Sequence, residues 1–243
     1  MRTAIVLVFA SLAMSTTALA GEWSLRAPKT LSFSGPIEEG EFGRFSVLFN
    51  SSIETLIVDS PGGLISEGLK IGQALALSRV TVEVHGLCMS SCANYIFLAG
   101  KRKILSEGIV GFHGDQTAFL DVMTKMTADL SPEIALQVWR INLDLPQTAK
   151  DEEIKSEIES AKLRAIEEQA FFKSLGVPQE FFDRAQKPDK GMNDGGIYYM
   201  LLPSRATFSR YHIEVEGEQS RRFIDTDPRV QAAKAAGRLL VVD

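Results

Sequence analysis

Two neighbouring serines and one histidine are the residues of this chain best suited to nucleophilic chemistry. Ser90 and Ser91 begin an apolar segment with helical character, and His113 ends a short apolar run and is followed by Gly114. A serine alcohol is a weak nucleophile until a base takes its proton, and a neutral histidine suits that task near pH 7. Taken alone, the serines also fit helix N-caps and the histidine a structural hydrogen bond. Their order and spacing favour the catalytic interpretation.

A glycine-rich turn precedes these residues. The sequence Asp59-Ser60-Pro61-Gly62-Gly63 follows an apolar, β-branched run at residues 55–58. Two glycines free the backbone to turn sharply and to expose N–H groups. Such groups can stabilise a developing oxyanion, by about 3 kcal/mol for each donor. Gly86 lies four residues before Ser90, where it would let the backbone approach the same site.

The two cysteines, Cys88 and Cys92, flank the serines. They could form a disulfide or remain two buried thiols, and the sequence favours neither. Two thiols do not complete a structural zinc site, and no spacing supplies three converging ligands, so we expect neither a metal nor a cofactor. We expect His85 to pack at a strand end and His212 to end a helix, without catalytic roles.

The elements that would position these residues alternate along the chain. Buried strands that alternate with helices predict an α/β protein with a mainly parallel sheet and right-handed crossovers. The patterns predict strands at residues 30–34, 55–58, 80–84, 103–105, 109–112 and 197–201, and helices at residues 42–49, 64–77, 93–99 and 203–211.

Between residues 115 and 187 the chain changes character. Strong helix formers dominate, and Ile154, Ile158, Ala161 and Ala165 share one face of a charged helix, which predicts a helical insertion or arm. From residue 214 to residue 243 the chain is a polar C-terminal extension, whose apolar end could form one more strand.

The first 20 residues have the pattern of a secretory signal peptide. Arg2 gives a positive start, residues 4–13 are apolar, and Ala18-Leu19-Ala20 has the small-x-small form of a cleavage site. We therefore expect cleavage before Gly21 and a periplasmic or secreted mature protein, which contacts a membrane only through this transient segment.

Composition limits the partners. The formal net charge is -5, and the chain has no long basic block, so nucleic acid is not an expected partner. Apolar residues make up 45% of the 243 residues, which is enough for one good core.

Residues 31–114 resemble the Clp protease proteolytic subunit and its relatives, including signal peptide peptidase A and the broader crotonase superfamily. The family's strand, Ser-Pro-Gly-Gly turn and helix are matched by residues 56–75. Its Gly-x-x-x-Ser motif, with a helix that ends in Ala-Gly, is matched by residues 86–90 and by Ala99-Gly100. Its strand-ending histidine is matched by His113. The Cys-x-Ser-x-Cys loop is similar to that of an exported Clp-like group of serine peptidases.

This resemblance implies a Clp/crotonase-like spiral of ββα units across residues 21–213. It implies Ser90 as nucleophile, His113 as base, and an oxyanion hole formed by the N–H groups of Gly62 or Gly63 and of Ser91. The implied activity is that of a serine peptidase acting on peptides or unfolded segments. Because relatives use a helical arm at subunit contacts, it also implies a homo-oligomer.

Several alternatives stay open. Spacing from Gly100 favours Ser91 as nucleophile, whereas spacing from Gly86 favours Ser90. The family's acidic third member would fall near residue 199, where no acid stands; Asp194, Asp183 or a plain Ser–His dyad could replace it.

Two other functions also remain open, one catalytic and one not. A Ser–Lys dyad would bring Lys101 or Lys103 to the serine. A non-catalytic binding or scaffold protein would keep the fold without turnover.

Overall fold

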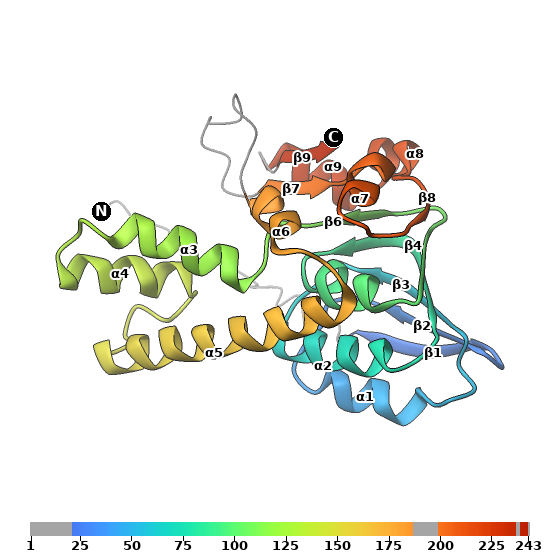
Figure 1. The fold of residues 1–243 in the computed structure, drawn as a ribbon, viewed down its shortest axis with the longest axis horizontal. Helices are drawn as coiled ribbons and strands as arrows, with labels where there is room; N and C mark the ends of the chain where they lie inside the picture. The colour runs from blue at the N-terminus through green and yellow to red at the C-terminus, as the bar shows by residue number, and fades with distance from the viewer. Residues whose placement is uncertain (1–20, 187–198, 237–238, 243) are drawn as a thin grey trace, which may run out of the picture.

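A computed structural model describes residues 21–186, 199–236 and 239–242. The protein is a mixed α/β structure built on a mostly parallel sheet, as predicted (Figure 1). The strand order is β1-β2-β3-β4-β5-β8, and β6 also pairs with β4. β1 is antiparallel to β2, and the other pairs in this sheet are parallel. The strands are β1 Glu22–Ala27, β2 Thr30–Ser34, β3 Thr55–Ser60, β4 Thr81–Met89, β5 Arg102–Leu105, β6 Ile109–Gly111 and β8 Glu216–Gly217.

Strand β4 is longer than predicted and changes partner along its length. Residues 81–84 pair with β5, and Leu87, Cys88 and Met89 pair with β6. The change falls at Gly86, whose backbone lies so close to Gly108 that a Cβ on Gly108 would stand 2.2 Å from the Gly86 carbonyl oxygen. This branch brings the carboxyl ends of β4 and β6 side by side.

Three helices cover the sheet near this branch. They are α1 Glu41–Leu48, α2 Ile65–Ala76 and η1 Cys92–Phe97, and α2 packs between the other two. The predicted helix at residues 93–99 is largely a π-helix, a form that often occurs at functional sites. Its residues are all buried, and Tyr95, Ile96 and Phe97 belong to the main core.

The predicted helical arm is present. It comprises α3 Gln116–Thr127, α4 Pro132–Asn142 and α5 Asp151–Leu175, followed by α6 Gln179–Gln186. Figure 1 shows α3, α4 and the first half of α5 extending away from the sheet. The arm has its own small core of Met123, Trp139 and Ile154, against which Ile158 packs.

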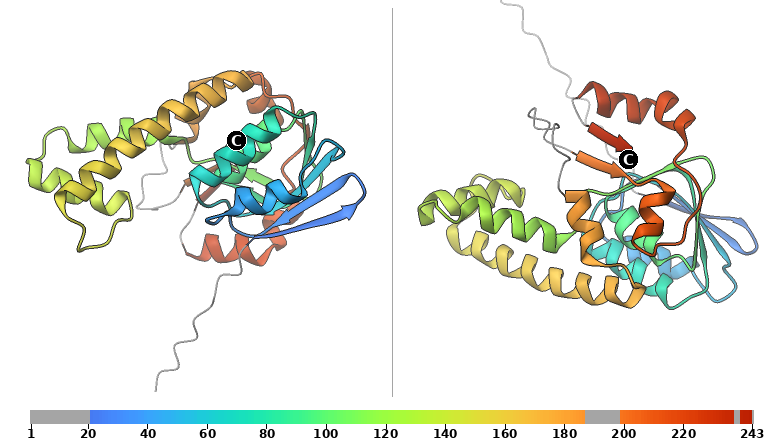
Figure 2. Two further views of the ribbon diagram at one scale, coloured as in Figure 1. Left: turned by 90° about the horizontal axis from the view of Figure 1, so that it is seen from below. Right: turned by 45° about the horizontal axis from the view of Figure 1, so that its top comes forward.

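The chain after residue 198 holds more structure than predicted. β7 Tyr199–Leu202 and α7 Arg205–Arg210 match the expected strand and helix, although α7 begins after Pro203 because the Ser204 hydroxyl caps it. The polar segment then forms α8 Arg221–Thr226, α9 Pro228–Ala235 and β9 Leu239–Val242, and β9 pairs with β7 in parallel. Figure 2 shows these last elements gathered at one end of the molecule.

The C-terminal helices pack on the end of β4. Ile224 and Val230 form a buried cluster with Leu87, Met89, Ile109 and Leu202. The C-terminal segment is therefore part of the structure that surrounds residue 90. The predicted signal peptide lies outside the described residues. Within the described ranges, no helix combines the length and the apolar character that a bilayer span requires.

Candidate active site

The side chains of Ser90 and His113 meet at the carboxyl ends of β4 and β6. Ser90 Oγ lies 2.7 Å from His113 Nε2, which is hydrogen-bonding distance. Ser90 follows β4 directly, and His113 comes two residues after the end of β6. The backbone N–H of Ser90 also donates to the Gly111 carbonyl at 3.0 Å. The pairing of these strands therefore sets the spacing between serine and histidine.

The backbone of Ser90 adopts an unusual conformation. Its φ is 54°, in the left-handed region that side-chain-bearing residues rarely occupy. Ser91 is already helical, and the Asn94 N–H donates to the Ser90 carbonyl at 2.8 Å. Ser90 is thus the single residue of a sharp strand-to-helix turn. Such strained positions persist where the surrounding structure holds them, and they cluster at active sites.

Cys88 and Cys92 form a disulfide across this turn. Both residues are fully buried, with Cys88 in β4 and Cys92 at the start of η1. The bridge therefore joins the strand before Ser90 to the helix after it. The Ser90–His113 contact is present together with the bridge, so the bridge leaves the serine side chain facing the histidine.

Ser91 has a different role from Ser90. It is buried, and its hydroxyl donates to the Gly63 carbonyl at 2.7 Å. Ser91 therefore fastens the Pro-Gly-Gly turn to the start of η1, and the hydroxyl that contacts His113 belongs to Ser90.

The two glycines of that turn differ in their N–H groups. The Gly62 N–H donates to the buried Ser60 hydroxyl at 3.1 Å. In the described part of the chain, the N–H groups of Gly63 and Ser91 donate to no acceptor. Gly62 has a φ of +90°, and a Cβ there would lie 2.9 Å from the Ser90 Cβ and 3.0 Å from the Ser91 nitrogen. Only glycine allows this close approach.

Gly86 makes room for a carboxylate, which differs from our expectation that it would shape an oxyanion site. A Cβ at Gly86 would stand 2.4 Å from the side chain of Asp59. Asp59 Oδ1 accepts hydrogen bonds from the Leu87 N–H and from Arg229 of α9, both at 2.8 Å. Arg229 was not expected from the sequence, because only the fold brings the C-terminal segment to β3.

Burial lowers the pKa of His113 below its ordinary value of 6.5, and a hydrogen bond with its own backbone partly opposes this effect. The ring is therefore neutral at pH 7 and available to accept a proton. Burial is the larger effect because the half-buried ring loses hydration that would favour the imidazolium form.

Asp194 and Asp183 are the acidic residues that the sequence offers for the third catalytic position. Asp194 lies outside the described residues. Asp183 is in α6 and accepts a hydrogen bond from Gln179 at 3.4 Å. The same Gln179 amide donates to Asp115 at 3.1 Å.

The two lysines are far from the serine. Lys103 pairs with Val82 in the sheet, eight residues before Ser90, which places it roughly 25 Å away. Its amine donates to the Gly100 carbonyl at 2.8 Å. Because Ser90 contacts His113 and not a lysine, the Ser–Lys alternative lacks the geometry it needs.

The other two histidines lie outside the site. His85 is more exposed than expected and pairs with Glu83 at 2.8 Å. His212 follows the end of α7, as expected. Among the residues that the structure describes, no group of three or more His, Cys, Asp or Glu side chains could hold a metal ion.

Asn94 supports the histidine loop and was not singled out from the sequence. It lies one helical turn after Ser90, is buried, and donates from Nδ2 to the Gly114 carbonyl at 2.8 Å. The signal for it was present, because Asn94 is a polar residue within an otherwise apolar run.

No protein-family model matches the chain, and no curated protein matches it. Among solved structures, a mutant of the 1510-N membrane-bound stomatin-specific protease is similar over 40% of this chain and 61% of that chain, with 15% identity and a TM-score of 0.28. The similarity is limited to less than half of this chain.

Proposed function

We propose that this protein is a serine hydrolase in which Ser90 is the nucleophile and His113 its general base. The observation that carries the proposal is the 2.7 Å contact between Ser90 Oγ and His113 Nε2. The left-handed backbone of Ser90 and the lowered pKa of His113 support it, because both fit an activated serine at a strained turn.

The reaction would proceed through an acyl-enzyme. Ser90 Oγ bonds to the substrate carbonyl carbon while His113 Nε2 takes the hydroxyl proton, and the carbonyl oxygen becomes an oxyanion. When the tetrahedral intermediate collapses, the bond to the leaving group breaks and His113 protonates that group. Water then attacks the acyl-enzyme carbonyl carbon while His113 takes its proton. When this second intermediate collapses, His113 returns the proton to Ser90 Oγ and the acid product leaves.

We assign the oxyanion hole to the N–H groups of Gly63 and Ser91. These two donors are unused by the described residues, and the Ser91 hydroxyl ties them together through the Gly63 carbonyl. Gly62, the other expected donor, already donates to Ser60. Asp194 remains our proposal for an acidic residue that orients His113.

We propose peptides as the substrate class and an extracytoplasmic location. The peptide assignment rests on the sequence resemblance to the Clp protease family. The location rests on the signal-like pattern of residues 1–20 and on the disulfide, a bond typical of oxidising compartments. Recovery of the full-length chain in the cytoplasm, with residues 1–20 still attached, would contradict the location.

Labelling with a fluorophosphonate tests the hydrolase proposal. The probe forms a covalent bond with an activated serine, so we expect the wild type to be labelled and Ser90→Ala to lose labelling completely. His113→Ala should label at least about a hundredfold more slowly, because general-base catalysis contributes at least that factor. The label should map to the peptide that contains Ser90.

Ser91→Ala serves as the matched control. It removes a neighbouring hydroxyl and the hold on Gly63 but keeps the dyad, so labelling should persist at a reduced rate. A folded wild type that is not labelled, or labelling that survives Ser90→Ala, would overturn the proposal and favour a non-catalytic role.

A further inference from the structure

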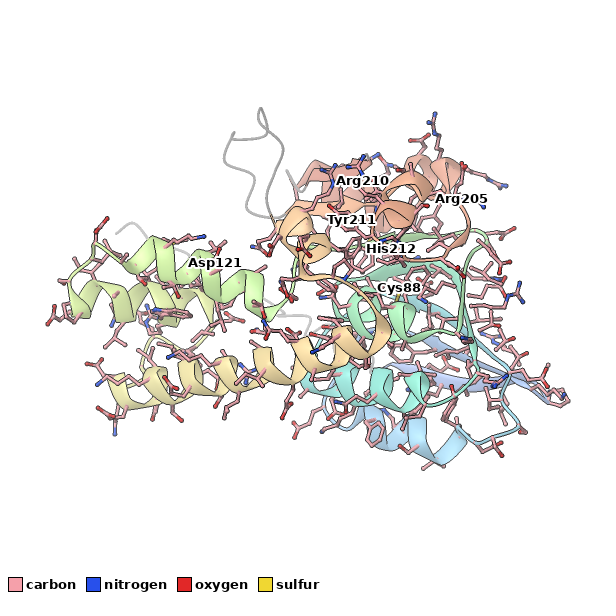
Figure 3. The ribbon with its side chains drawn as sticks, in the orientation of Figure 1. Cys88, Asp121, Arg205, Arg210, Tyr211 and His212 are labelled. Atoms are coloured by element: carbon pink, nitrogen blue, oxygen red, sulfur yellow. A yellow bond between two sulfur atoms is a disulfide. The ribbon has the colours of Figure 1, made fainter. Side chains whose placement is uncertain are left out.

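A cavity that is rich in positive charge lies away from Ser90. Its volume is about 480 Å³, within the range of small-ligand sites. It lies between the start of β5, helix α7 and the segment that leads to β8; Figure 3 labels Arg205 and His212 on its α7 side. It is lined by Lys101, Arg102, Lys103, Arg205, Ser209, His212, Ile213, Glu214, Val215 and Glu216.

The charge of this lining is unusual for an acidic protein. Lys101, Arg102, Lys103 and Arg205 face only two carboxylates, although the whole chain has a net charge of -5. One of the carboxylates, Glu216, is held by Arg102 through two hydrogen bonds of 2.8 and 2.7 Å. That bidentate pair fixes one wall and leaves an excess of cations in the rest of the cavity.

The remaining cations have unused hydrogen-bond donors. In the portion of the chain that the structure describes, the side chains of Lys101 and Arg205 make no hydrogen bond or ion pair. Lys103 is partly buried, and its amine donates to the Gly100 carbonyl, which leaves two of its three N–H groups free. The Ser209 hydroxyl and the His212 ring add two further polar groups.

The electrostatics favour an incoming anion. Burial, aided by the charge of Lys101 and opposed by Glu214, lowers the pKa of Lys103. A negatively charged ligand between these amines would relieve both their repulsion and their loss of hydration.

The cavity is separate from the serine site. Arg102 pairs with Thr81 at the first residue of β4, whereas Ser90 follows its last residue, so the β5 wall of the cavity lies roughly 30 Å from Ser90 along the strand. A ligand in the cavity would therefore not contact Ser90 or His113.

We propose that this cavity is a binding site for a small, multiply charged oxyanion. Arg205, Lys101 and Lys103 are the groups that bind its carboxylate or phosphate oxygens, and Ser209 and His212 add further polar contacts. The site takes a free small molecule, because the cavity has the volume of a ligand pocket and is bounded on one side by the Arg102–Glu216 pair. This proposal does not depend on the hydrolase function.

Calorimetric titration of the mature chain tests the site. Pyrophosphate and citrate are titrated separately in low-salt buffer at pH 7, with sodium chloride of equal ionic strength as the blank. We expect saturable binding of at least one of the two, and the difference between them shows whether phosphate or carboxylate oxygens are preferred. Arg205→Gln should weaken that binding by about tenfold, the loss of one charge-assisted contact.

Arg210→Gln is the matched control, because Arg210 is in the same helix and does not line the cavity. It should bind as tightly as the wild type. Circular dichroism verifies that each variant is folded. If Arg205→Gln does not fold, Lys101→Gln provides a second test. Absence of saturable binding of both anions, or equal weakening by Arg205→Gln and Arg210→Gln, would overturn the site.

Discussion

Ser90, the proposed nucleophile, has an unfavourable backbone conformation. A non-glycine residue with φ of 54° costs about 1–3 kcal/mol, so its neighbours must hold it there. Three restraints do so: the Ser90 N–H to Gly111, the Asn94 N–H to the Ser90 carbonyl, and the disulfide on either side. These restraints direct the hydroxyl toward His113.

The lowered pKa of His113 predicts the pH dependence of serine reactivity. The base must be neutral to accept a proton. Because burial lowers the pKa of His113 below its ordinary value of 6.5, the ring stays neutral at a lower pH than an exposed histidine would. The rate of fluorophosphonate labelling should therefore rise with pH and reach half its maximum below pH 6.5. The rate constant is measured between about pH 4 and pH 8, a range that extends to both sides of the ordinary histidine pKa.

An exposed histidine provides the control for this profile. His85→Gln removes a surface imidazole and should leave the midpoint unchanged. A wild-type midpoint at or above pH 6.5 would show that His113 is not the buried base that we describe.

Residue types and spacing predicted that Ser90 and His113 would meet, but not the residues that hold them in place. The order of Gly62-Gly63, Ser90 and His113 along the chain led us to expect these residues in one place, and the fold brings Ser90 into contact with His113 and Gly62 close to Ser90. The spacing left Ser90 and Ser91 open, because the choice depends on a left-handed turn that no residue type at that position requires. The Asp59–Arg229 pair spans 170 residues, so only the folded chain reveals it.

At the scale of elements, Glu168 joins the arm to the helix that follows the serine. It is fully buried in α5, accepts a hydrogen bond from the Tyr95 hydroxyl of η1, and accepts another from the Gln116 N–H of α3 at 2.7 Å. Its pKa is raised to about 7: burial is the largest cause and Asp115 adds to it, while the two hydrogen bonds and Arg164 lower the pKa. The junction of three helices therefore depends on a carboxyl that is partly protonated near neutral pH.

This junction predicts a pH-dependent stability. Because the folded pKa of about 7 exceeds the ordinary 4.5, the folded state binds the proton more tightly, and stability falls as pH rises through this window. Glu168→Gln has no titrating group at this position. Relative to that variant, the free energy of unfolding of the wild type should fall by about 3 kcal/mol between pH 4.5 and pH 8. Urea denaturation at several pH values measures both proteins.

Glu167→Gln, on the exposed side of the same helix, is the control and should follow the wild type. A constant difference between wild type and Glu168→Gln at all pH values would contradict a titrating Glu168.

The strength of the local pattern explains which elements were predicted. The arm was visible because Ile154, Ala161 and Ala165 repeat on one face over several turns. Helices α8 and α9 were missed, because each is short and buries a single residue, Ile224 or Val230. β1 was missed for a similar reason, since it lies at a sheet edge without a buried residue.

At the scale of the whole molecule, the C-terminal helices α8 and α9 pack back against the sheet. The C-terminal helices contact the ends of β3 and β4 in two ways: Arg229 forms an ion pair with Asp59 of β3, and Ile224 and Val230 join the buried cluster around Leu87 and Met89 of β4. The ion pair is partly exposed, with side-chain exposures of 44% and 29%, and so contributes little. The apolar cluster is therefore the main attachment.

Ile224→Ala tests whether this attachment supports the serine site. Deleting a buried isoleucine side chain should cost about 2–4 kcal/mol and leave a cavity beside Leu87 and Met89, directly before Ser90. We expect slower fluorophosphonate labelling as well as lower stability in urea, because Met89 leads into the strained turn. The same deletion at Ile166, which is 63% exposed on the arm, is the matched control and should alter neither measurement appreciably. If Ile224→Ala lowers stability and leaves labelling of the folded fraction unchanged, the C-terminal segment stabilises the fold without shaping the site.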